Sequence, residues 1–113
     1  MKRELVYLAA PYSNPDPSVV QARYEAVNRV AGGLMREGLV VFSPISHSHP
    51  IDATFEKPEG WDFWKVQDFG ILELCERLLV LPLPGWRDSV GVNAEIDYAE
   101  SLNIPVTFLK VTI

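Results

Sequence analysis

Four short apolar segments alternate along this chain with three longer segments of mixed polarity. The first three short segments are apolar at every position, which is typical of strands that are buried on both faces of a sheet. The fourth begins after a proline, a residue that is tolerated at the start of a strand. Strands are therefore predicted at Leu5–Ala9, Leu39–Phe42, Leu78–Leu81 and Val106 to about Val111.

Three helices are predicted between these strands. Asp16 is expected to cap the first helix, with Pro17 at the first helical position, where a missing N–H costs nothing. This helix runs to about Glu37, and Gly38 ends it as a C-terminal cap. Its apolar stripe has spacings of four and three residues and comprises Val20, Tyr24, Val27, Ala31 and Leu34. The other two helices are predicted over Trp61 to about Arg77 and Val90 to Leu102.

Two connections carry most of the polar and proline content. The stretch from Ser43 to Gly60 holds three prolines and two histidines, and it is predicted as a long irregular connection of the kind that often carries function. The stretch from Pro82 to Asp88 is predicted as a loop, with Asp88 or Ser89 capping the helix that follows. Asn103 is expected to end that helix.

The order of elements predicts the fold class. Apolar strands that alternate with amphipathic helices indicate a parallel sheet with helices on both faces. We expect a flavodoxin-like (Rossmann-like) three-layer α/β sandwich with four or five strands in the order 2-1-3-4. Ligands bind such sheets at the carboxyl ends of the strands. That rule brings three segments to one rim: Pro11–Asn14, Ser43–Asp52 and Pro84–Ser89.

Length and charge narrow the range of functions. The chain has 113 residues, so residues 1–113 are predicted to form a single domain. Fifteen acidic and ten basic residues give a formal charge of −5, which disfavours duplex nucleic acid and anionic membranes as partners. With no targeting or membrane segment, the expected location is the cytoplasm. Two exposed sheet edges in a short chain favour a homodimer or larger homo-oligomer.

Asp68 interrupts the apolar stripe of the second predicted helix. The apolar members of that stripe, at spacings of three and four residues around it, are Trp61, Trp64, Ile71 and Cys75. A carboxylate among apolar side chains is costly unless it is paired, hydrogen-bonded or functional. Asp68 is therefore a candidate functional group. The alternative is a carboxylate at the edge of the stripe that bonds to a backbone amide or to Arg77.

Glu95 lies beside the predicted buried side of the third helix, which includes Val92, Ile96 and Ala99. The positive end of the helix dipole favours an ionised carboxylate near the helix start, where it could act as a nucleophile or stabilise charge. The alternative is a surface glutamate that only stabilises the helix. That arrangement is very common.

The segment from Pro84 to Gly91 leads into the same helix. Gly85 and Gly91 allow a ligand to approach the backbone closely, the amides that follow can hold an anion, and Ser89 adds a hydroxyl. One interpretation is a cradle for a phosphate or sugar, and the other is a plain turn with an N-cap serine. The usual ATP and dinucleotide motifs are absent, so no cofactor is expected.

His47 and His49 suggest a metal site, with Asp52 or Asp62 as a third ligand. Two histidines in an irregular loop are not a spacing signature, however, and no metal is expected. The histidines are predicted to bind a ligand or to shape the loop. The nearby aromatic residues are predicted as core or pocket wall, where one could stack on a base. They are Trp61, Phe63, Trp64 and Trp86.

These residues together resemble a known superfamily. Tyr7-Leu8-Ala9-Ala10-Pro11, Asp68 in a central helix, and the series Gly85, Ser89, Gly91, Glu95 and Ala99 resemble the nucleoside 2-deoxyribosyltransferases. That superfamily includes the 2'-deoxynucleoside 5'-phosphate N-hydrolases. A finer pattern resembles a bacterial and phage branch of unknown function, the DUF1937 proteins, over nearly the whole chain. It comprises Phe42-Ser43-Pro44-Ile45, His47-Ser48-His49-Pro50 and Pro84-Gly85-Trp86-Arg87-Asp88-Ser89.

The resemblance implies roles for particular residues. In that superfamily a glutamate attacks the anomeric carbon, an aspartate helps to protonate the leaving base, and a tyrosine positions the nucleophile. These residues are Glu95, Asp68 and Tyr7 here, and Ser89 matches a serine that contacts a 5'-phosphate or 5'-hydroxyl. The other candidate substrate-binding residues are Pro11, Ser13, His47, His49, Trp64, Gly85, Trp86, Arg87 and Gly91.

One loop departs from the pattern of the N-hydrolases. Their loop after strand one carries an arginine for phosphate, whereas Pro11–Asn14 has none. Arg87, Arg23 and His47 are the candidates to replace it. Some members of the superfamily also complete the site with a C-terminal segment of a neighbouring subunit.

The resulting hypothesis is cleavage or transfer at the N-glycosidic bond of a (deoxy)nucleoside or nucleoside 5'-monophosphate. Glu95 is expected to stay ionised, while burial raises the pKa of Asp68 and makes it the acid. One alternative is a nucleotide- or sugar-binding module without catalysis. Another is a small protein-interaction domain.

Overall fold

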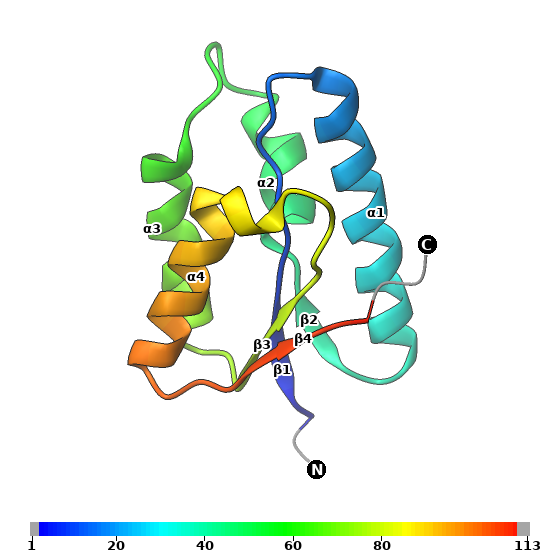
Figure 1. Cartoon of the computed structure of the whole chain (residues 1–113), viewed down its shortest axis with the longest axis vertical. Coiled ribbons are helices and arrows are strands. Elements are labelled where there is room, and N and C mark those ends of the chain that lie inside the picture. Colours follow the sequence, from blue (N-terminus) through cyan, green and yellow to red (C-terminus); the bar gives the residue numbers. More distant parts are fainter. Residues whose placement is uncertain (1–2, 111–113) are drawn as a thin grey trace.

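In a computed structural model, which describes residues 3–110, four parallel strands form one sheet between layers of helices (Figure 1). The spatial order is β2-β1-β3-β4, which confirms the predicted order and fixes the number of strands at four for the described chain. The strands are β1 (Leu5–Ala9), β2 (Val40–Phe42), β3 (Arg77–Val80) and β4 (Val106–Phe108).

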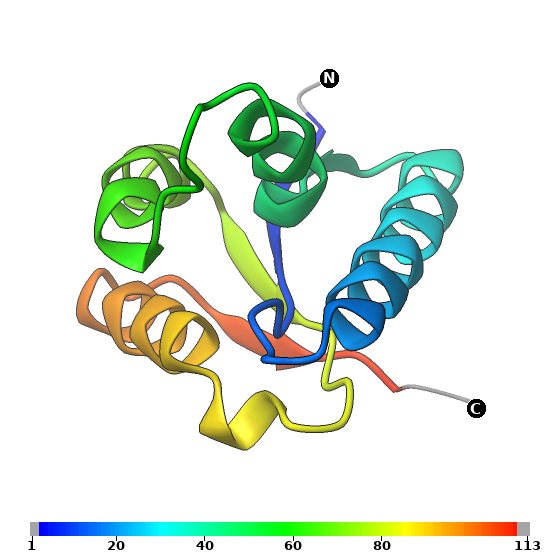
Figure 2. The same ribbon diagram turned by 90° about the horizontal axis from the view of Figure 1, so that it is seen from above.

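Helices cover both faces of the sheet (Figure 2). Helix α1 (Pro17–Arg36) lies on one face, whereas α3 (Trp61–Leu72) and α4 (Val90–Ser101) lie on the other. A short helix, α2 (Pro44–Asp52), follows β2 and packs beside α1. A single 3-10 turn, η1 (Trp86–Asp88), precedes α4. The predicted three-layer flavodoxin-like α/β architecture is confirmed.

The alternation of side chains along β1 divides the core in two. Val6 and Leu8 point to the α1 face, and Tyr7 and Ala9 point to the face covered by α3 and α4. This follows from the period of two in a strand. All four side chains are buried because β1 is a central strand with helices on both sides.

The predicted helix ends are largely confirmed. The Asp16 carboxylate accepts a hydrogen bond from the Ser18 N–H at 2.9 Å, with Pro17 at the first position of α1. Ser89 caps α4 by accepting from the Val92 N–H at 3.2 Å. Gly38 and Asn103 follow α1 and α4 with φ of 101° and 59°, the left-handed conformation that ends a helix.

The prediction of an irregular connection from Ser43 to Gly60 is wrong over its first half. Helix α2 occupies Pro44–Asp52 and buries Ile45 against the α1 face. Ser43 precedes it in extended conformation, with Pro44 at the first helical turn. Serine followed by proline is itself a helix start signal, but Pro50 and the polar composition of the segment obscured it.

The second predicted helix ends earlier than expected. Helix α3 stops at Leu72, and Arg77 belongs to β3, where it pairs with Val6 of β1. No glycine or proline marks this end in the sequence. The apolar stripe continues to Cys75, so the boundary is set by pairing between strands rather than by helix periodicity.

The remaining boundaries shift by a few residues. The second strand begins at Val40, the third spans Arg77–Val80, and α4 ends at Ser101. The last strand ends at Phe108, and the predicted end near Val111 lies outside the described residues. Across residues 3–110, no helix has both the length and the apolar character that crossing a membrane requires.

Candidate functional site

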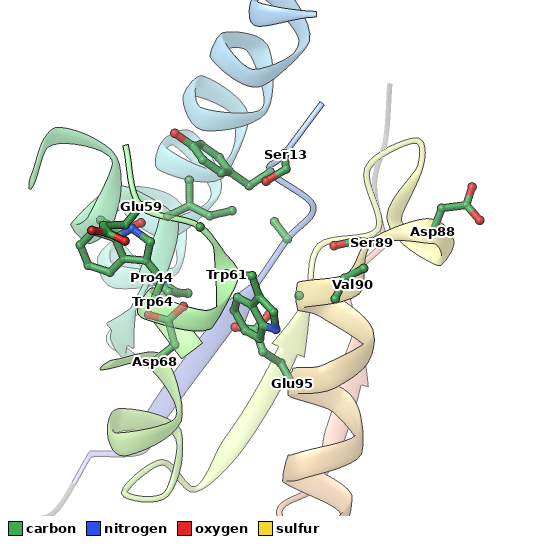
Figure 3. A pocket seen from close by; sticks show the side chains of 16 residues that line it. Ser13, Pro44, Glu59, Trp61, Trp64, Asp68, Asp88, Ser89, Val90 and Glu95 are labelled. Carbon is green, nitrogen blue, oxygen red and sulfur yellow. The ribbon is translucent and has the colours of Figure 1, made fainter. Parts of the chain in front are cut away.

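A pocket of about 280 Å³ opens at the carboxyl edge of the sheet, with α3 and α4 on opposite sides (Figure 3). All three predicted rim segments contribute to it, so their convergence is confirmed. The loop after β1, the start of α2 and the turn before α4 each supply side chains. The lining residues are Ala10, Tyr12, Ser13, Pro44, Ile45, Ser48, Glu59, Gly60, Trp61, Trp64, Asp68, Asp88, Ser89, Val90, Gly91 and Glu95.

Two buried carboxyl groups line this pocket, and a buried tyrosine outside the lining is bonded to one of them. Asp68 comes from α3 and Glu95 from α4, and the two side chains approach the pocket from its two sides (Figure 3). They are 6% and 4% exposed, and Tyr7 in the middle of β1 is fully buried. The Tyr7 hydroxyl donates a hydrogen bond to Oε2 of Glu95. Tyr7 and Glu95, which are 88 positions apart in sequence, are therefore in contact, and Asp68 lies near enough to raise the pKa of both.

Asp68 is buried, and its Oδ1 has no hydrogen-bond partner within residues 3–110. Burial raises the pKa of Asp68 to about 7, because removing water disfavours the charged form. The alternative partner, Arg77, instead donates to Glu4 at 3.1 Å. Asp68 is therefore a buried carboxyl group of the pocket lining whose pKa lies near neutral pH.

Glu95 does not keep the low pKa that the sequence suggested. Burial raises the pKa of Glu95, the hydrogen bond from Tyr7 lowers it, and the neighbouring Asp68 raises it by a smaller amount, so that the net pKa is about 8. The expectation that the helix dipole keeps Glu95 ionised is wrong for two reasons. Glu95 lies beyond the first turn, where the dipole is weak, and desolvation of a buried carboxylate outweighs it. The alternative of a surface glutamate is also wrong.

The Tyr7 hydroxyl keeps its proton at neutral pH. Its burial, followed by the charges of Glu95 and Asp68, raises the pKa of the phenol well above 10. The hydroxyl is therefore a permanent donor to Glu95, and a donated hydrogen bond favours the ionised form of a carboxylate. Tyr7 thus opposes the desolvation that makes ionisation of Glu95 costly.

Arg23 joins two of the loops that form the pocket. Its guanidinium donates to the carbonyl oxygens of Ser13 and Pro84 at 2.9 Å each, and to that of Tyr12 at 3.5 Å. Gly85 follows with φ of 90°, and a Cβ there would lie 2.6 Å from Nη2 of Arg23. Gly85 therefore shapes the rim and leaves room for Arg23, although it does not line the pocket.

Two tryptophans form one wall of the pocket. Trp61 packs against Gly91, where an added Cβ would lie 3.6 Å from the ring. Trp64 donates from Nε1 to Oδ1 of Asp52 at 3.1 Å, and the same oxygen accepts from the Glu59 N–H at 2.9 Å. Asp52 thereby ties the end of α2 to α3 and to the loop between them. This wall is fixed by polar bonds as well as by packing.

Several predicted substrate-binding residues lie outside the pocket lining. Pro11 is fully buried in the core. The Arg87 guanidinium lies 5.2 Å over the Trp86 ring, which itself packs against Phe108. The residues of the prediction that do line the pocket are Ser13, Trp64, Asp68, Ser89, Gly91 and Glu95.

The two histidines occupy different surroundings, and neither lines the pocket. His47 is exposed beside Phe42. The His49 ring stacks on Tyr24 at 3.8 Å and is hydrogen-bonded to the Tyr12 hydroxyl through Nδ1. His49 therefore supports a residue of the lining rather than contacting the pocket itself. Within residues 3–110, no group of three or more histidine, cysteine or acidic side chains is placed to hold a metal ion.

The prediction contained six of the sixteen lining residues. Four others were named only within sequence motifs: Ala10, Pro44, Ile45 and Ser48. Tyr12, Glu59, Gly60, Asp88 and Val90 were not singled out as site residues, and Trp61 was assigned only to core or wall. Three of these lie within one or two residues of positions that were selected. Glu59 and Gly60 had no local signal, because their place depends on the hydrogen bond from Glu59 to Asp52.

Comparison with known proteins gives one family. The family model described as a domain of unknown function, DUF1937, matches residues 4–111. The match spans all the strands and helices described above. No match to a curated protein was found.

Proposed function

This chain belongs to the DUF1937 family, and we propose that it cleaves or transfers the N-glycosidic bond of a (deoxy)nucleoside or nucleoside 5'-monophosphate. One observation carries the proposal: buried Asp68 and Glu95 enter one pocket from facing helices, with Tyr7 bonded to Glu95. Two carboxyl groups with separate roles are what glycosidic cleavage requires. The resemblance to the nucleoside 2-deoxyribosyltransferase superfamily assigns the same three residues.

The proposed reaction divides the work between the two carboxyl groups. A Glu95 oxygen forms a bond to the anomeric carbon while the bond from that carbon to the base nitrogen breaks. The electron pair of the broken bond goes to the base, which takes the proton from Asp68. Asp68 then removes a proton from water, or from the nitrogen of a second base, and that nucleophile releases the sugar from Glu95. Glu95 and Asp68 end in their starting states.

The reactive form carries one proton shared between two groups. The pKa values of about 7 for Asp68 and about 8 for Glu95 lie close together, so the protons leave the pair in two coupled steps. The productive arrangement places the remaining proton on Asp68 and the charge on Glu95. Because the pKa of Glu95 is the higher of the two, the remaining proton lies mostly on Glu95, and the productive form is the less populated one. The Tyr7 hydrogen bond raises the population of the productive form, because it stabilises the ionised Glu95 more than the protonated one.

The wall and size of the pocket suit a flat heterocycle. Trp64 lies on the same side as Asp68, and the Trp61 ring lies between Asp68 and Glu95, against Gly91 of α4 (Figure 3). Aromatic faces of this kind stack on bases. A base on this wall would have its linking nitrogen near Asp68 and its sugar toward Glu95. The volume of about 280 Å³ is near the lower limit for small-ligand sites, which favours a compact ligand.

A binding module without catalysis is the second candidate function, and one observation favours it. With a pKa of about 8, Glu95 is largely protonated at neutral pH in the free protein. A protonated carboxyl group is a hydrogen-bond donor rather than a nucleophile. In a binding module the buried pair would hold ligand hydroxyls or base nitrogens and break no bond.

One experiment separates these candidates. The protein is incubated with a panel of nucleosides and their 5'-monophosphates, and free base is measured by chromatography. Release that disappears in Glu95→Gln and persists in Asp97→Asn supports the proposal, because Asp97 is an exposed acid on the same helix outside the lining. Ligand-induced stabilisation without release of base supports the binding module. Neither effect with any compound contradicts both and leaves an interaction domain.

The cytoplasmic location and the homo-oligomer stay predictions. The proposed assembly follows from the two sheet edges that the fold leaves at β2 and β4. Sedimentation at micromolar concentration tests the assembly, and a monomer there would contradict it.

A further inference from the structure

We infer that the pocket accepts the uncharged nucleoside and discriminates against its 5'-monophosphate. The inference rests on the proposed function and names its substrate class. It follows from the charges that line the pocket and from the positions of the basic side chains around it.

The ionisable lining is acidic throughout. Four acidic residues line the pocket, with Glu59 and Asp68 on the α3 side and Asp88 and Glu95 on the α4 side (Figure 3). The Asp88 carboxylate points away from the cavity, and the other three acids lie around it (Figure 3). Within residues 3–110, no lysine, arginine or histidine belongs to the lining. A phosphate monoester carries close to two negative charges at neutral pH. In this pocket it would meet no opposite charge, and any ionised carboxyl group there would repel it.

The three basic residues that were candidates to replace the missing loop arginine all lie outside the lining. The Arg23 guanidinium donates hydrogen bonds to three carbonyl oxygens of the loops at the rim. Arg87 lies over the ring of Trp86. These are two of the three residues that could have replaced the missing arginine of the first loop. The third, His47, is exposed beside Phe42 and outside the lining.

The start of α4 does not restore an anion site. The Ser89 oxygen already accepts the Val92 N–H, and Asp88 places an acidic side chain one residue before this cap. The negative charge of Asp88 partly cancels the positive potential at the N-terminus of α4, which would otherwise attract a phosphate. A 5'-hydroxyl differs from a phosphate because it can donate a hydrogen bond to a carboxylate, whereas a phosphate dianion has only acceptors.

The first test compares each nucleoside with its own 5'-monophosphate on the wild-type protein. Release of base is measured as kcat/KM, and binding is measured in parallel by calorimetry. We expect roughly a tenfold or larger preference for the nucleoside at low ionic strength. The preference should narrow as salt is added, because salt screens repulsion at the exposed rim.

The second test supplies the missing charge. Ser13 lines the pocket from the loop after β1 and is exposed, so Ser13→Arg adds a cation at the rim without filling a core position. The ratio of monophosphate to nucleoside kcat/KM should rise several-fold in this variant. Ser101→Arg is the matched control, because Ser101 is an exposed serine at the opposite end of α4. It should leave the ratio unchanged.

Each outcome separates this inference from the proposed function. Equal or better use of the monophosphate by the wild-type protein overturns the inference and keeps N-glycosidic cleavage. Nucleoside binding that excludes the monophosphate, with no base released, supports the inference and overturns catalysis. A ratio that rises equally in Ser13→Arg and Ser101→Arg overturns the local charge argument. Failure of both ligands to bind and to react overturns both claims.

Discussion

The two faces of the sheet differ in chemistry although they share the same strands. The core on the α1 face is built from aliphatic side chains, among them Val6, Leu8 and Val27. The core on the other face contains Tyr7 and adjoins the buried acids Asp68 and Glu95. Alternation along β1 sends consecutive residues to opposite faces. One face therefore contributes mainly packing, while the other holds titratable groups that packing alone would exclude.

This difference shows that the face covered by α3 and α4 contains groups that destabilise the fold. A buried carboxyl group without a full set of partners is costly, and Asp68 has one unpartnered oxygen. Burial under a helix of this fold does not by itself require an acid, because the buried residues of α1, Val27 and Ala31, are both apolar. Groups that weaken a fold and face a pocket are typical of functional sites.

Removing the Glu95 charge gives the largest expected effect. Glu95→Gln keeps the shape of the side chain but removes the nucleophile, so turnover should fall by roughly a thousandfold or more. The melting temperature should stay the same or rise, because the variant removes an ionisable group from a buried site. Release of base and thermal unfolding, measured on the same preparation, check both halves.

The equivalent change at Asp68 sharpens this result. Asp68→Asn should slow substrates with good leaving bases less than those with poor ones, because good leaving groups need less protonation. If Glu95→Gln lowers the melting temperature while its folded fraction keeps wild-type specific activity, Glu95 has a structural role. The two faces of the sheet would then not differ in function.

Adjacent residues of β1 compare the two faces directly. Leu8→Ala empties space on the α1 face and should cost about 2–5 kcal/mol of unfolding free energy. Tyr7→Phe keeps the ring and removes one hydroxyl, so it should cost only about 1 kcal/mol. Its effect should appear in catalysis instead. Without the bond to Glu95, the acidic limb of the pH–rate profile should move to higher pH.

The measurements are denaturant unfolding and kcat/KM against pH for both variants. Leu8→Ala should leave the position of the acidic limb unchanged. An acidic limb that moves equally in the two variants would show that Tyr7 acts only through packing.

The pH dependence of stability should come from the face that holds the acids. The folded pKa values of Asp68 and Glu95 are raised to about 7 and about 8, so the folded chain binds more protons than the unfolded chain. The protonated carboxyl groups are uncharged, so burial does not disfavour them as it disfavours the ionised groups. Stability is therefore highest below the ordinary carboxyl pKa and is lost as pH rises through 7 and 8, with a slope of about 1.4 kcal/mol per pH unit for each proton retained.

Unfolding midpoints between pH 5 and pH 9 test this sign. The double variant Asp68→Asn/Glu95→Gln should flatten the curve. A wild-type midpoint that rises across this range would contradict the raised pKa values.

Loosening the connection made by Arg23 gives the smallest effect. Arg23→Lys keeps the charge but loses the fork that holds the carbonyls of Ser13 and Pro84. Gly85→Ala should act in the same way, because its Cβ would displace Arg23. In both variants KM should rise a few-fold with little change in kcat, since the loops bind substrate but carry no reacting group.

Gly33→Ala is the matched control for Gly85→Ala. Gly33 lies in α1 with open space around its Cα, so an alanine there should stabilise by up to about 1 kcal/mol. KM should stay unchanged in this control. If KM is also unchanged in Gly85→Ala, the contacts of Arg23 with the two loops do not affect substrate binding.

The order of the elements could be predicted from sequence because it depends on local signals. Runs such as Leu5–Ala9 are apolar at every position, and Asp16 with Pro17 marks a helix start within two residues. Parallel pairing then follows from the lengths of the connections. The convergence of three segments at one rim is a consequence of that topology and needed no side-chain detail.

Tertiary structure decided what depends on neighbours distant in sequence. Helix α3 ends at Leu72 because Arg77 pairs with Val6, and the Pro44–Asp52 segment is helical with Ile45 packed on the α1 face. The protonation of Glu95 follows from burial among residues that no local pattern brings together. Periodicity reports which side of an element is apolar, whereas desolvation depends on everything that covers that side. The sequence therefore determined which carboxyl groups were candidates, and only the packing of α3 and α4 over β1 decided that both are buried together.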